Sequence, residues 1–275
     1  MSIGIWLNGG LGNQLFMICC TLSYALDKNI SCIIYSGEHN VDGGRPTYWT
    51  NLLENLYKYV KPYTNNQLVY KEPKFEYVPL PDYLSHNNYT LSGYFQSYKY
   101  FEHNYTKICN LLKIQEKKEF TKHKYSQYFR KKTIALHFRI NDYRNIQDCH
   151  PIQTVYYYIN ALKHLLENLH DINEYDILYA FQDGDEDIVD GYIKLLKQHF
   201  ALDFIHISHD IADWEQMLLM ASCDHLIIAN STFSYFAAYF CTNPNKLVYC
   251  PKDWFGPVLA EHNTKDLCPN SWIHI

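Results

Sequence analysis

The chain has 275 residues, of which 47% are hydrophobic and 19% are charged. These values are typical of a folded globular protein and exclude an intrinsically disordered chain. The length allows one large or two small domains. The formal net charge of −5 provides no general basic surface, which argues against a protein that binds nucleic acid.

The cysteines and the apolar segments indicate the compartment. Nine cysteines form no C-x-x-C pair and no zinc-binding spacing. No secretory signal precedes the first predicted strand, and no apolar run is long enough to span a membrane. We therefore expect a cytoplasmic protein with free thiols and no transmembrane segment. Three Asn-x-Ser/Thr triplets are then interpreted as chance matches to the glycosylation pattern.

The first element of the chain is a predicted strand over 3–7. A glycine-rich turn follows over 8–14, and 15–26 carry apolar residues at helical spacing. A strand, a glycine turn and a helix together provide free N–H groups that bind phosphate. The turn matches neither the dinucleotide fingerprint nor the Walker loop, so a tight turn without a ligand is an equally open interpretation.

The middle of the first half is less regular. A second strand is predicted over 32–35, whereas 40–90 contain several prolines and no long periodic run. A turn over 92–97 precedes a predicted helix over 98–114. The lysine-rich segment 113–132 has little apolar periodicity and is the candidate domain boundary. We therefore expect an N-terminal domain over 1–125 and a C-terminal domain over 126–275.

The second half has a regular alternation of strands and helices. Strands are predicted over 133–138, 176–181, 203–207, 225–229 and 246–250, and helices over 153–169, 186–199, 212–222 and 232–241. This alternation predicts an α/β fold with a doubly wound, mostly parallel sheet. The carboxyl ends of its strands share one edge, where open α/β sheets bind ligands.

Polar side chains gather at this shared edge. The strand ends deliver three groups: His137, Arg139 and Asp142; Gln182, Asp183 and Asp185; and Asn230, Ser231, Thr232 and Ser234. An arginine can donate two N–H groups to a phosphate, and the start of a helix attracts anions. The set fits a nucleoside diphosphate. Helix capping by the hydroxyls and a simple strand end at Arg139 remain alternative interpretations.

The acidic segment Asp183–Asp187 also resembles a metal site. An Asp-x-Asp sequence can hold a divalent ion on a diphosphate. An EF-hand is excluded, because Ile188 occupies the position that requires glycine. A solvated acidic helix start is the other interpretation, and the helix dipole favours it. We expect no metal ligands here.

Several motifs, taken together and in order, resemble one known family. The opening Asn8–Phe16 resembles the first signature of glycosyltransferase family 11, the α-1,2-fucosyltransferases. Its later segments resemble Gly93–Ser97 with Tyr100-Phe101, His137–Tyr143, Asn230–Ala238, and Pro251–Phe255 through Trp272. The resemblance spans nearly the whole chain.

The resemblance implies a GT-B-like fold of two facing Rossmann-like domains. It also implies a GDP-fucose donor, inversion at the anomeric carbon, and no cofactor or obligatory metal. By this resemblance Arg139 holds the β-phosphate, and Asp224, before the fourth strand of the second half, accepts from guanine. The other implied substrate-binding residues are Gly10, Asn13, Gln14, His137, Asp183, Ser231, Thr232 and Ser234.

The resemblance further implies transfer of fucose to the 2-hydroxyl of a galactose-like acceptor sugar, whose pocket we place in 40–90. Asp142 is the nearest candidate for the general base, and capping of a turn is its alternative role. Ile140 stands where the family has a second arginine, and Asp183-Gly184 where it has two acids. A transferase for another nucleotide sugar and an inactive sugar-nucleotide-binding module therefore remain alternatives.

Overall fold

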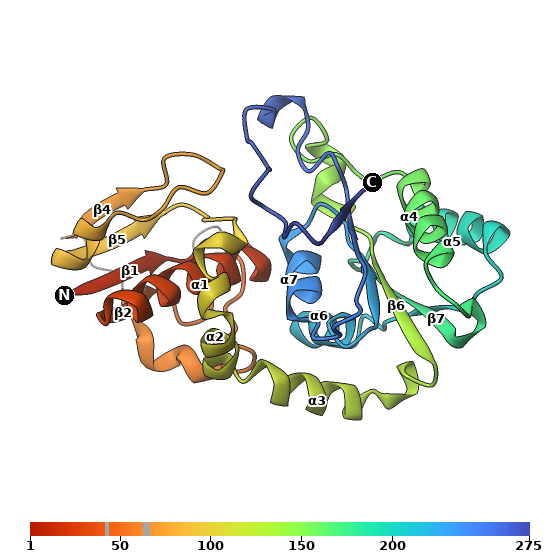
Figure 1. Cartoon of the computed structure of the whole chain (residues 1–275), viewed down its shortest axis with the longest axis horizontal. Helices are drawn as coiled ribbons and strands as arrows, with labels where there is room; N and C mark the ends of the chain where they lie inside the picture. The colour runs from red at the N-terminus through yellow and green to blue at the C-terminus, as the bar shows by residue number, and fades with distance from the viewer. Residues whose placement is uncertain (42–43, 63–66) are drawn as a thin grey trace. The chain divides into compact units, whose positions relative to one another are not determined.

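The computed structural model describes residues 1–41, 44–62 and 67–275. The chain divides into two compact units (Figure 1), of which the first comprises Met1–Glu116 with His262–Pro269. The second unit comprises Lys117–Glu261 with Asn270–Ile275. Part of the predicted acceptor region, 42–43 and 63–66, lies outside the described residues.

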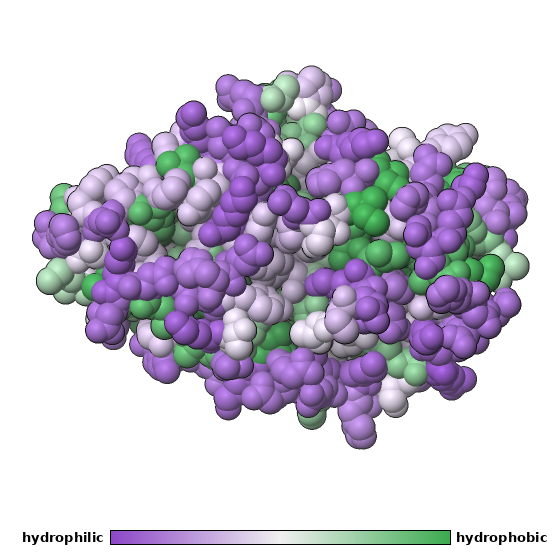
Figure 2. Space-filling view, in the orientation of Figure 1, coloured by the Kyte–Doolittle hydropathy of each residue, from purple (hydrophilic) through white to green (hydrophobic). Residues whose placement is uncertain are grey.

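The change from the first unit to the second falls in α3 (Ile114–Lys124), inside the lysine-rich segment. The sequence placed this boundary between 125 and 126. It lies earlier because α3 contacts the second unit: Lys118 Nζ donates to the carbonyl of Phe240, and Lys124 pairs with Glu215. Mostly hydrophilic atoms cover α3 in Figure 2, as expected for its charge-rich sequence.

The first unit contains a five-stranded sheet in which every strand pair is parallel. Its strand order is β3-β2-β1-β5-β4. The strands are β1 (Ser2–Trp6), β2 (Ser31–Tyr35), β3 (Val60–Lys61), β4 (Leu68–Lys71) and β5 (Asn88–Ser92). The 18-residue helix α1 (Leu11–Lys28) packs on β1 and β2, and its middle is almost wholly buried.

Short helices fill the rest of the first unit. They are η1 (Glu54–Tyr59), η2 (Asp82–His86), η3 (Tyr98–Tyr100), η4 (Glu102–Asn104) and α2 (Tyr105–Leu112). The predicted helix over 98–114 is thus divided into three pieces. It ends at Lys113, whose φ of 53° lies in the left-handed region and stops the helical hydrogen bonding.

The second unit contains a six-stranded parallel sheet with the order β11-β10-β9-β6-β7-β8. The strands are β6 (Lys132–His137), β7 (Tyr175–Ala180), β8 (Phe204–His206), β9 (His225–Ile227), β10 (Val248–Cys250) and β11 (Ile273–His274). If these six strands are renumbered 1 to 6 along the chain, their order from the β8 edge is 3-2-1-4-5-6. This is the doubly wound Rossmann arrangement. The predicted fold class is confirmed.

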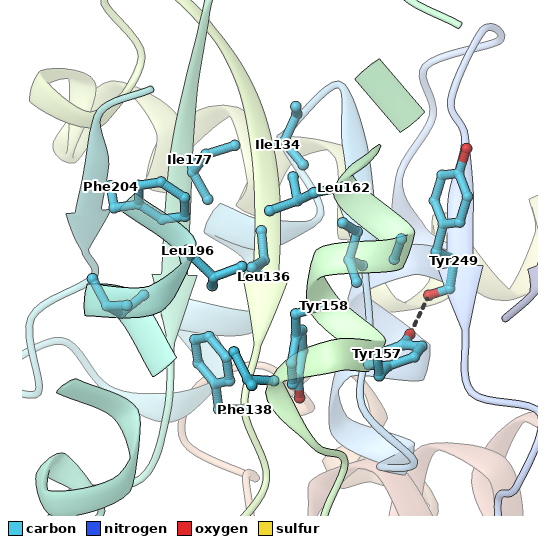
Figure 3. Packing of buried hydrophobic residues seen from close by; sticks show 14 of the residues in the cluster. Ile134, Leu136, Phe138, Tyr157, Tyr158, Leu162, Ile177, Leu196, Phe204 and Tyr249 are labelled. Atoms are coloured by element: carbon cyan, nitrogen blue, oxygen red, sulfur yellow. Dashed lines mark hydrogen bonds between the residues drawn. The ribbon is translucent and has the colours of Figure 1, made fainter. Parts of the chain in front are cut away.

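Helices cover both faces of the second sheet. Figure 1 shows α4 (Val155–Glu167) and α5 (Glu186–His199) on one side, and α6 (Asp213–Met220) and α7 (Thr232–Phe240) on the other. Between α4 and the sheet lies a hydrophobic core in which Leu136, Phe138 and Tyr158 are at most 1% exposed (Figure 3). The buried Tyr157 hydroxyl is satisfied by the carbonyls of Ile228 and Tyr249.

None of the helices in the described part of the chain combines the length and the apolar character that a membrane crossing requires. All nine cysteines are free, and Cys19 and Cys20 are buried in α1 as small apolar side chains.

Candidate functional site

The strand order of the second sheet reverses between β6 and β9. In a parallel sheet, the crevice beyond the carboxyl ends of two such strands is the usual ligand site. His137 ends β6 and is followed by Arg139, while Asn230 and Ser231 follow β9. The structure therefore brings two of the predicted groups to the position where this topology binds ligands.

Arg139 is the cation of this crevice. Its Nη2 donates to both carboxylate oxygens of Asp142, at 2.8 and 2.9 Å, and its Nη1 contacts Gln182 Oε1 at 3.4 Å. The guanidinium lies over the ring of Tyr143, 5.1 Å from the ring centroid. Its Nε is buried and has no hydrogen-bond partner among the described residues. Arg139 thus retains an unused donor.

The loop that carries Asp142 is fixed at several points. It is the short helix η6 (Asn141–Asn145), and the buried Asp185 carboxylate accepts from the N–H of Asn141 and from Arg144. The Tyr143 hydroxyl donates to the carbonyl of Asn230 at 2.9 Å, and burial raises the pKa of Tyr143 to about 12. This bond joins the segment after β6 to the segment after β9.

His137 is 6% exposed, and its ring packs against Phe233 at a centroid distance of 5.4 Å. Burial, with a smaller contribution from the charge of Arg139, lowers the pKa of His137 to about 3. The imidazole is therefore neutral near pH 7. Its Nδ1 is buried without a hydrogen-bond partner among the described residues.

The hydroxyl of the N-cap residue of α7 does not cap the helix. Ser231 occupies the N-cap position and is 5% exposed, but its side chain makes no capping hydrogen bond. The hydroxyl of Ser234 donates back to the carbonyl of Ser231 at 3.3 Å. Thr232, partly buried, is the first helical residue. The positive end of α7 therefore opens without a side-chain acceptor from its N-cap residue, which favours binding of an anion.

Ile140 occupies the position where the resembling family has a second arginine. It is 1% exposed and belongs to the hydrophobic core of the second unit. The next arginine along the chain, Arg144, points to other partners, because it pairs with Asp185 at 3.2 Å and Asp187 at 2.5 Å. Arg139 is thus the arginine that lies at the switch point, which is the place where the strand order reverses between β6 and β9.

Asp183 lies in an exposed turn after β7, next to Gly184 with its φ of 90°. Ligand atoms of Asp183, Glu186 and His209 all lie within 4.8 Å of one another. Asp185, the other acid of the Asp-x-Asp sequence, faces Arg144 and the Asn141 N–H instead. An ion here would therefore be held by a different set of residues from the one the sequence suggested.

The structure does not bring Asp224 to this group. Its Oδ2 accepts the N–H of Thr133 at 2.8 Å, and its own N–H donates to the carbonyl of Thr133. Thr133 lies at the start of β6, whereas Arg139 follows the end of β6. Asn243 Nδ2 contacts Asp224 Oδ1 at 3.2 Å. Asp224 therefore joins the amino ends of the strands, at the opposite edge from the switch point.

A cavity of about 880 Å³ also lies at that opposite edge. Arg130, Lys131 and the first residues of β7 and β8 line it. Lys131 pairs there with the buried Asp176 at 3.0 Å. None of the predicted site residues lines this cavity.

The first unit repeats the same topological feature. Its strand order reverses between β1 and β5, and the glycine-rich turn follows β1. Gly9 has a φ of 77°, and Gly10 is the N-cap of α1 without a side-chain cap. A Cβ at Gly10 would meet nothing within 4 Å. The turn therefore leaves open space at an uncapped helix start, which is the geometry predicted for a phosphate cradle.

Two side chains organise this turn. Gln14 is wholly buried and donates to the carbonyls of Gly9 and Pro46, at 3.0 and 2.9 Å. Asn13 Oδ1 accepts from Gln96 Nε2 at 3.0 Å. Gln96 follows β5, so this bond connects the two motifs across the switch point. Gln14 is thus structural in this conformation, while Asn13 lies at the edge where ligands bind.

Comparison with known proteins gives relatives consistent with this site. No family model matches the chain. The chain is 27% identical over 146 residues to the O-antigen biosynthesis glycosyltransferase WbnK of Escherichia coli. It is also 27% identical over 146 residues to an alpha-1,2-colitosyltransferase of Escherichia coli. Each match covers 52% of this chain, and the matches cover 44% and 47% of the relatives, about half their length.

The solved structures that resemble the chain share its fold. E. coli ADP-heptose lps heptosyltransferase II has a TM-score of 0.55 at 13% identity, with 100% of this chain and 90% of that one covered. POFUT1 in complex with GDP has a TM-score of 0.53 at 11% identity and 90% and 97% coverage. NodZ alpha-1,6-fucosyltransferase co-crystallized with GDP has a TM-score of 0.52 at 12% identity and 90% and 94% coverage.

The chain therefore has the α/β fold of the GT-B type, with two Rossmann-like units. The resemblance that the motifs indicated is also confirmed, because both curated relatives are glycosyltransferases and one is an alpha-1,2-colitosyltransferase.

Proposed function

We propose that the chain is an inverting glycosyltransferase that moves fucose from GDP-fucose to the 2-hydroxyl of a galactose-like acceptor. The observation that carries this proposal is the cation at the β6/β9 switch point. Arg139 has an unused buried donor there, on the same sheet edge as the uncapped start of α7. An arginine and a helix start suit a diphosphate.

In the proposed reaction the acceptor oxygen forms a bond to the anomeric carbon of fucose. The bond from that carbon to the β-phosphate oxygen breaks, and its electron pair leaves with GDP. Arg139 stabilises the negative charge that grows on the departing diphosphate. One positioned donor in such a role is typically worth about 3–4 kcal/mol of the activation free energy.

Asp142 is the proposed acceptor of the proton from the acceptor hydroxyl. Its carboxylate contacts Arg139, so its two roles, as a base and as a partner that orients Arg139, compete for the same oxygens. Binding of a diphosphate to Arg139 offers the guanidinium another anion and so weakens its hold on Asp142. The base would thus be released when the donor is in place.

The neutral His137, Ser231, Thr232, Ser234 and Asp183 are the remaining proposed donor contacts of the second unit. Gly10 and Asn13 are those of the first unit. Asp224 is left out, because its carboxylate is engaged at the other edge of the sheet. We propose no obligatory metal, since Arg139 and the start of α7 already supply positive charge to the site.

A second candidate donor is suggested by one relative. Its name describes an alpha-1,2-colitosyltransferase, and colitose is a deoxy analogue of fucose. The buried Ile140, which removes one cation, favours a third candidate, an inactive module that only binds the nucleotide sugar.

Calorimetry with GDP, GDP-fucose, GDP-colitose, GDP-mannose and UDP tests the specificity for the nucleotide and the specificity for the sugar separately. We expect GDP and GDP-fucose to bind and UDP not to bind. Incubation of the bound donor with an array of acceptor glycans then measures transfer. Binding of UDP in preference to GDP would overturn the proposed nucleotide, and binding without transfer or hydrolysis would favour the inactive module.

A further inference from the structure

Glu72 follows β4 in the first unit, and β4 lies beside β5 in the sheet (Figure 1). The carboxylate of Glu72 is hydrogen-bonded to the turn that follows β5. Its Oε2 accepts the N–H groups of Tyr94 and Phe95, at 2.8 and 3.0 Å. The backbone N–H of Glu72 also donates to the carbonyl of Ser92. One carboxylate oxygen thus holds two successive backbone donors of the turn 93–96.

The turn is built around this contact. Gly93 has a φ of 152°, and a Cβ placed on it would lie 2.4 Å from the Cβ of Glu72. Only glycine therefore allows β5 to approach Glu72 so closely. Phe95, which is not a glycine, adopts a φ of 51° and is wholly buried. Such a conformation persists only where its surroundings fix it, and the bond to Glu72 does so.

The turn in turn reaches the glycine-rich loop. The residue after Phe95 is Gln96, whose Nε2 donates to Asn13 Oδ1 at 3.0 Å. On its far side the turn is fastened by Ser97, whose hydroxyl donates to the carbonyl of Asp266 at 2.6 Å. A connected path of contacts therefore runs from Glu72 through the turn to Asn13.

No ion pair joins this carboxylate to a lysine, arginine or histidine among residues 1–41, 44–62 and 67–275. The ionisable groups that interact with its charge are Cys20 of α1, Tyr70 of β4 and Tyr100 of η3, and none of these is positive. Burial raises the pKa of Glu72 to about 7, although the two backbone hydrogen bonds oppose this. Its second oxygen, Oε1, is buried without a partner among the described residues.

We propose that Glu72 is a positioning residue of the glycine-rich loop, which its carboxylate holds through the turn 93–96. The consequence for catalysis rests on the proposed function above. A protonated carboxyl is a weaker acceptor than a carboxylate, so the turn loosens when Glu72 takes up a proton. Gln96 then loses its fixed position against Asn13, and the donor site of the first unit loses its order.

The first test needs no substrate. In ¹⁵N–¹H spectra of the full chain recorded from pH 5.5 to 8.5, the amide signals of Tyr94 and Phe95 should shift together with one midpoint near 7. Glu72→Gln should abolish this shift. Glu76→Gln is the matched control, because Glu76 is a carboxylate of the segment after β4 that pairs only weakly with Lys74 at 3.8 Å, and it should leave the shift intact. Amide signals that do not titrate, or that titrate unchanged in Glu72→Gln, would overturn the proposal.

The second test is transfer of fucose over the same pH range. In the wild type, kcat/KM should fall to a lower level as the pH drops through the midpoint near 7, and in Glu72→Gln this acid limb should be flat. A positioning role predicts that the loss appears mainly in the KM of the donor. An acid limb that persists in Glu72→Gln argues against it. If no sugar is transferred at any pH, the proposed function fails, while the amide titration still decides the role of Glu72.

Discussion

One nitrogen of Arg139, Nη2, contacts both carboxylate oxygens of Asp142, at 2.8 and 2.9 Å. This arrangement leaves the Nε of Arg139 buried and without a partner among the described residues. An unsatisfied buried donor costs about 1–3 kcal/mol, so a ligand that accepts from it gains free energy on binding. The pair thus favours an incoming anion while it holds the candidate base in place.

Arg139→Ala should lower kcat for transfer from GDP-fucose on the order of a hundredfold or more, because the departing diphosphate loses its cation. Steady-state kinetics measure this. Arg130→Ala is the control, since Arg130 is an exposed arginine of the same unit that lines the cavity at the opposite sheet edge. Turnover close to wild type in Arg139→Ala would refute the assignment.

Asp142→Asn separates the two proposed roles of this side chain. If Asp142 accepts the proton, kcat should fall steeply while the KM of the donor changes little. If it only orients Arg139, the donor KM should rise instead. Asp148→Asn, an exposed acid after η6, serves as the control.

Gly10→Ala tests the phosphate cradle. A Cβ at Gly10 has no neighbour within 4 Å among the described residues, and its φ of −71° suits alanine. The free energy of unfolding should therefore fall by no more than about 1 kcal/mol, the usual cost of alanine at an N-cap. If a donor phosphate occupies that space, the donor KM should rise on the order of tenfold or more. In Gly9→Ala, by contrast, the φ of 77° and a contact of 2.7 Å with Asn13 should reduce stability itself. An unchanged KM in Gly10→Ala would place the phosphate elsewhere.

His137 should make the second unit sensitive to acid. Its pKa is about 3 in the folded chain and near 6.5 when unfolded, so the unfolded chain binds the proton more tightly. Stability is therefore lost as the pH falls below 6.5, by about 2 kcal/mol between pH 7 and pH 5. Urea unfolding at several pH values should show a shallower pH dependence in His137→Gln. An equal dependence in both proteins would mean that folding does not lower the pKa of His137.

Asp224→Ala should destabilise the second unit by roughly 1–3 kcal/mol, because the N–H of Thr133 loses its acceptor. The donor KM should not change, since Asp224 lies at the other sheet edge. Denaturant unfolding and kinetics of the same variant provide both measurements. A raised KM for GDP-fucose with unchanged stability would instead support contact with guanine.

EDTA should leave transfer unchanged, because the proposed site supplies its positive charge from Arg139 and α7. Loss of activity in EDTA that Mn²⁺ restores would contradict this. The variant Glu186→Gln would then show whether the ion is held by the Asp183, Glu186 and His209 cluster.

The regular second half could be predicted from its sequence, since each strand and helix has a clear apolar pattern. His137 ends β6 and Arg139 follows it, so the sheet edge at which they lie could be predicted from the fold. The side-chain partners of the site residues could not be predicted, because contacts between residues far apart in the sequence leave no local pattern. Nothing in the sequence indicates that Asp185 binds the loop after β6, or that Glu72 binds the turn after β5.

Asp224 illustrates a different limit. Its role was taken from the resemblance alone, although its position directly before β9 puts it at the amino end of that strand, away from Arg139. The short helices of the first unit were also beyond prediction, because they depend on tertiary contacts rather than on periodicity.

The membership of 262–269 in the first unit sets a condition for making hybrid enzymes. Asp266 gives its carbonyl to Ser97 and its carboxylate to Lys99, so the late segment completes the early half. A chimera that exchanges halves with a relative at α3 alone would leave these partners mismatched. Grafts that exchange the first unit should therefore carry 262–269 together with 1–116.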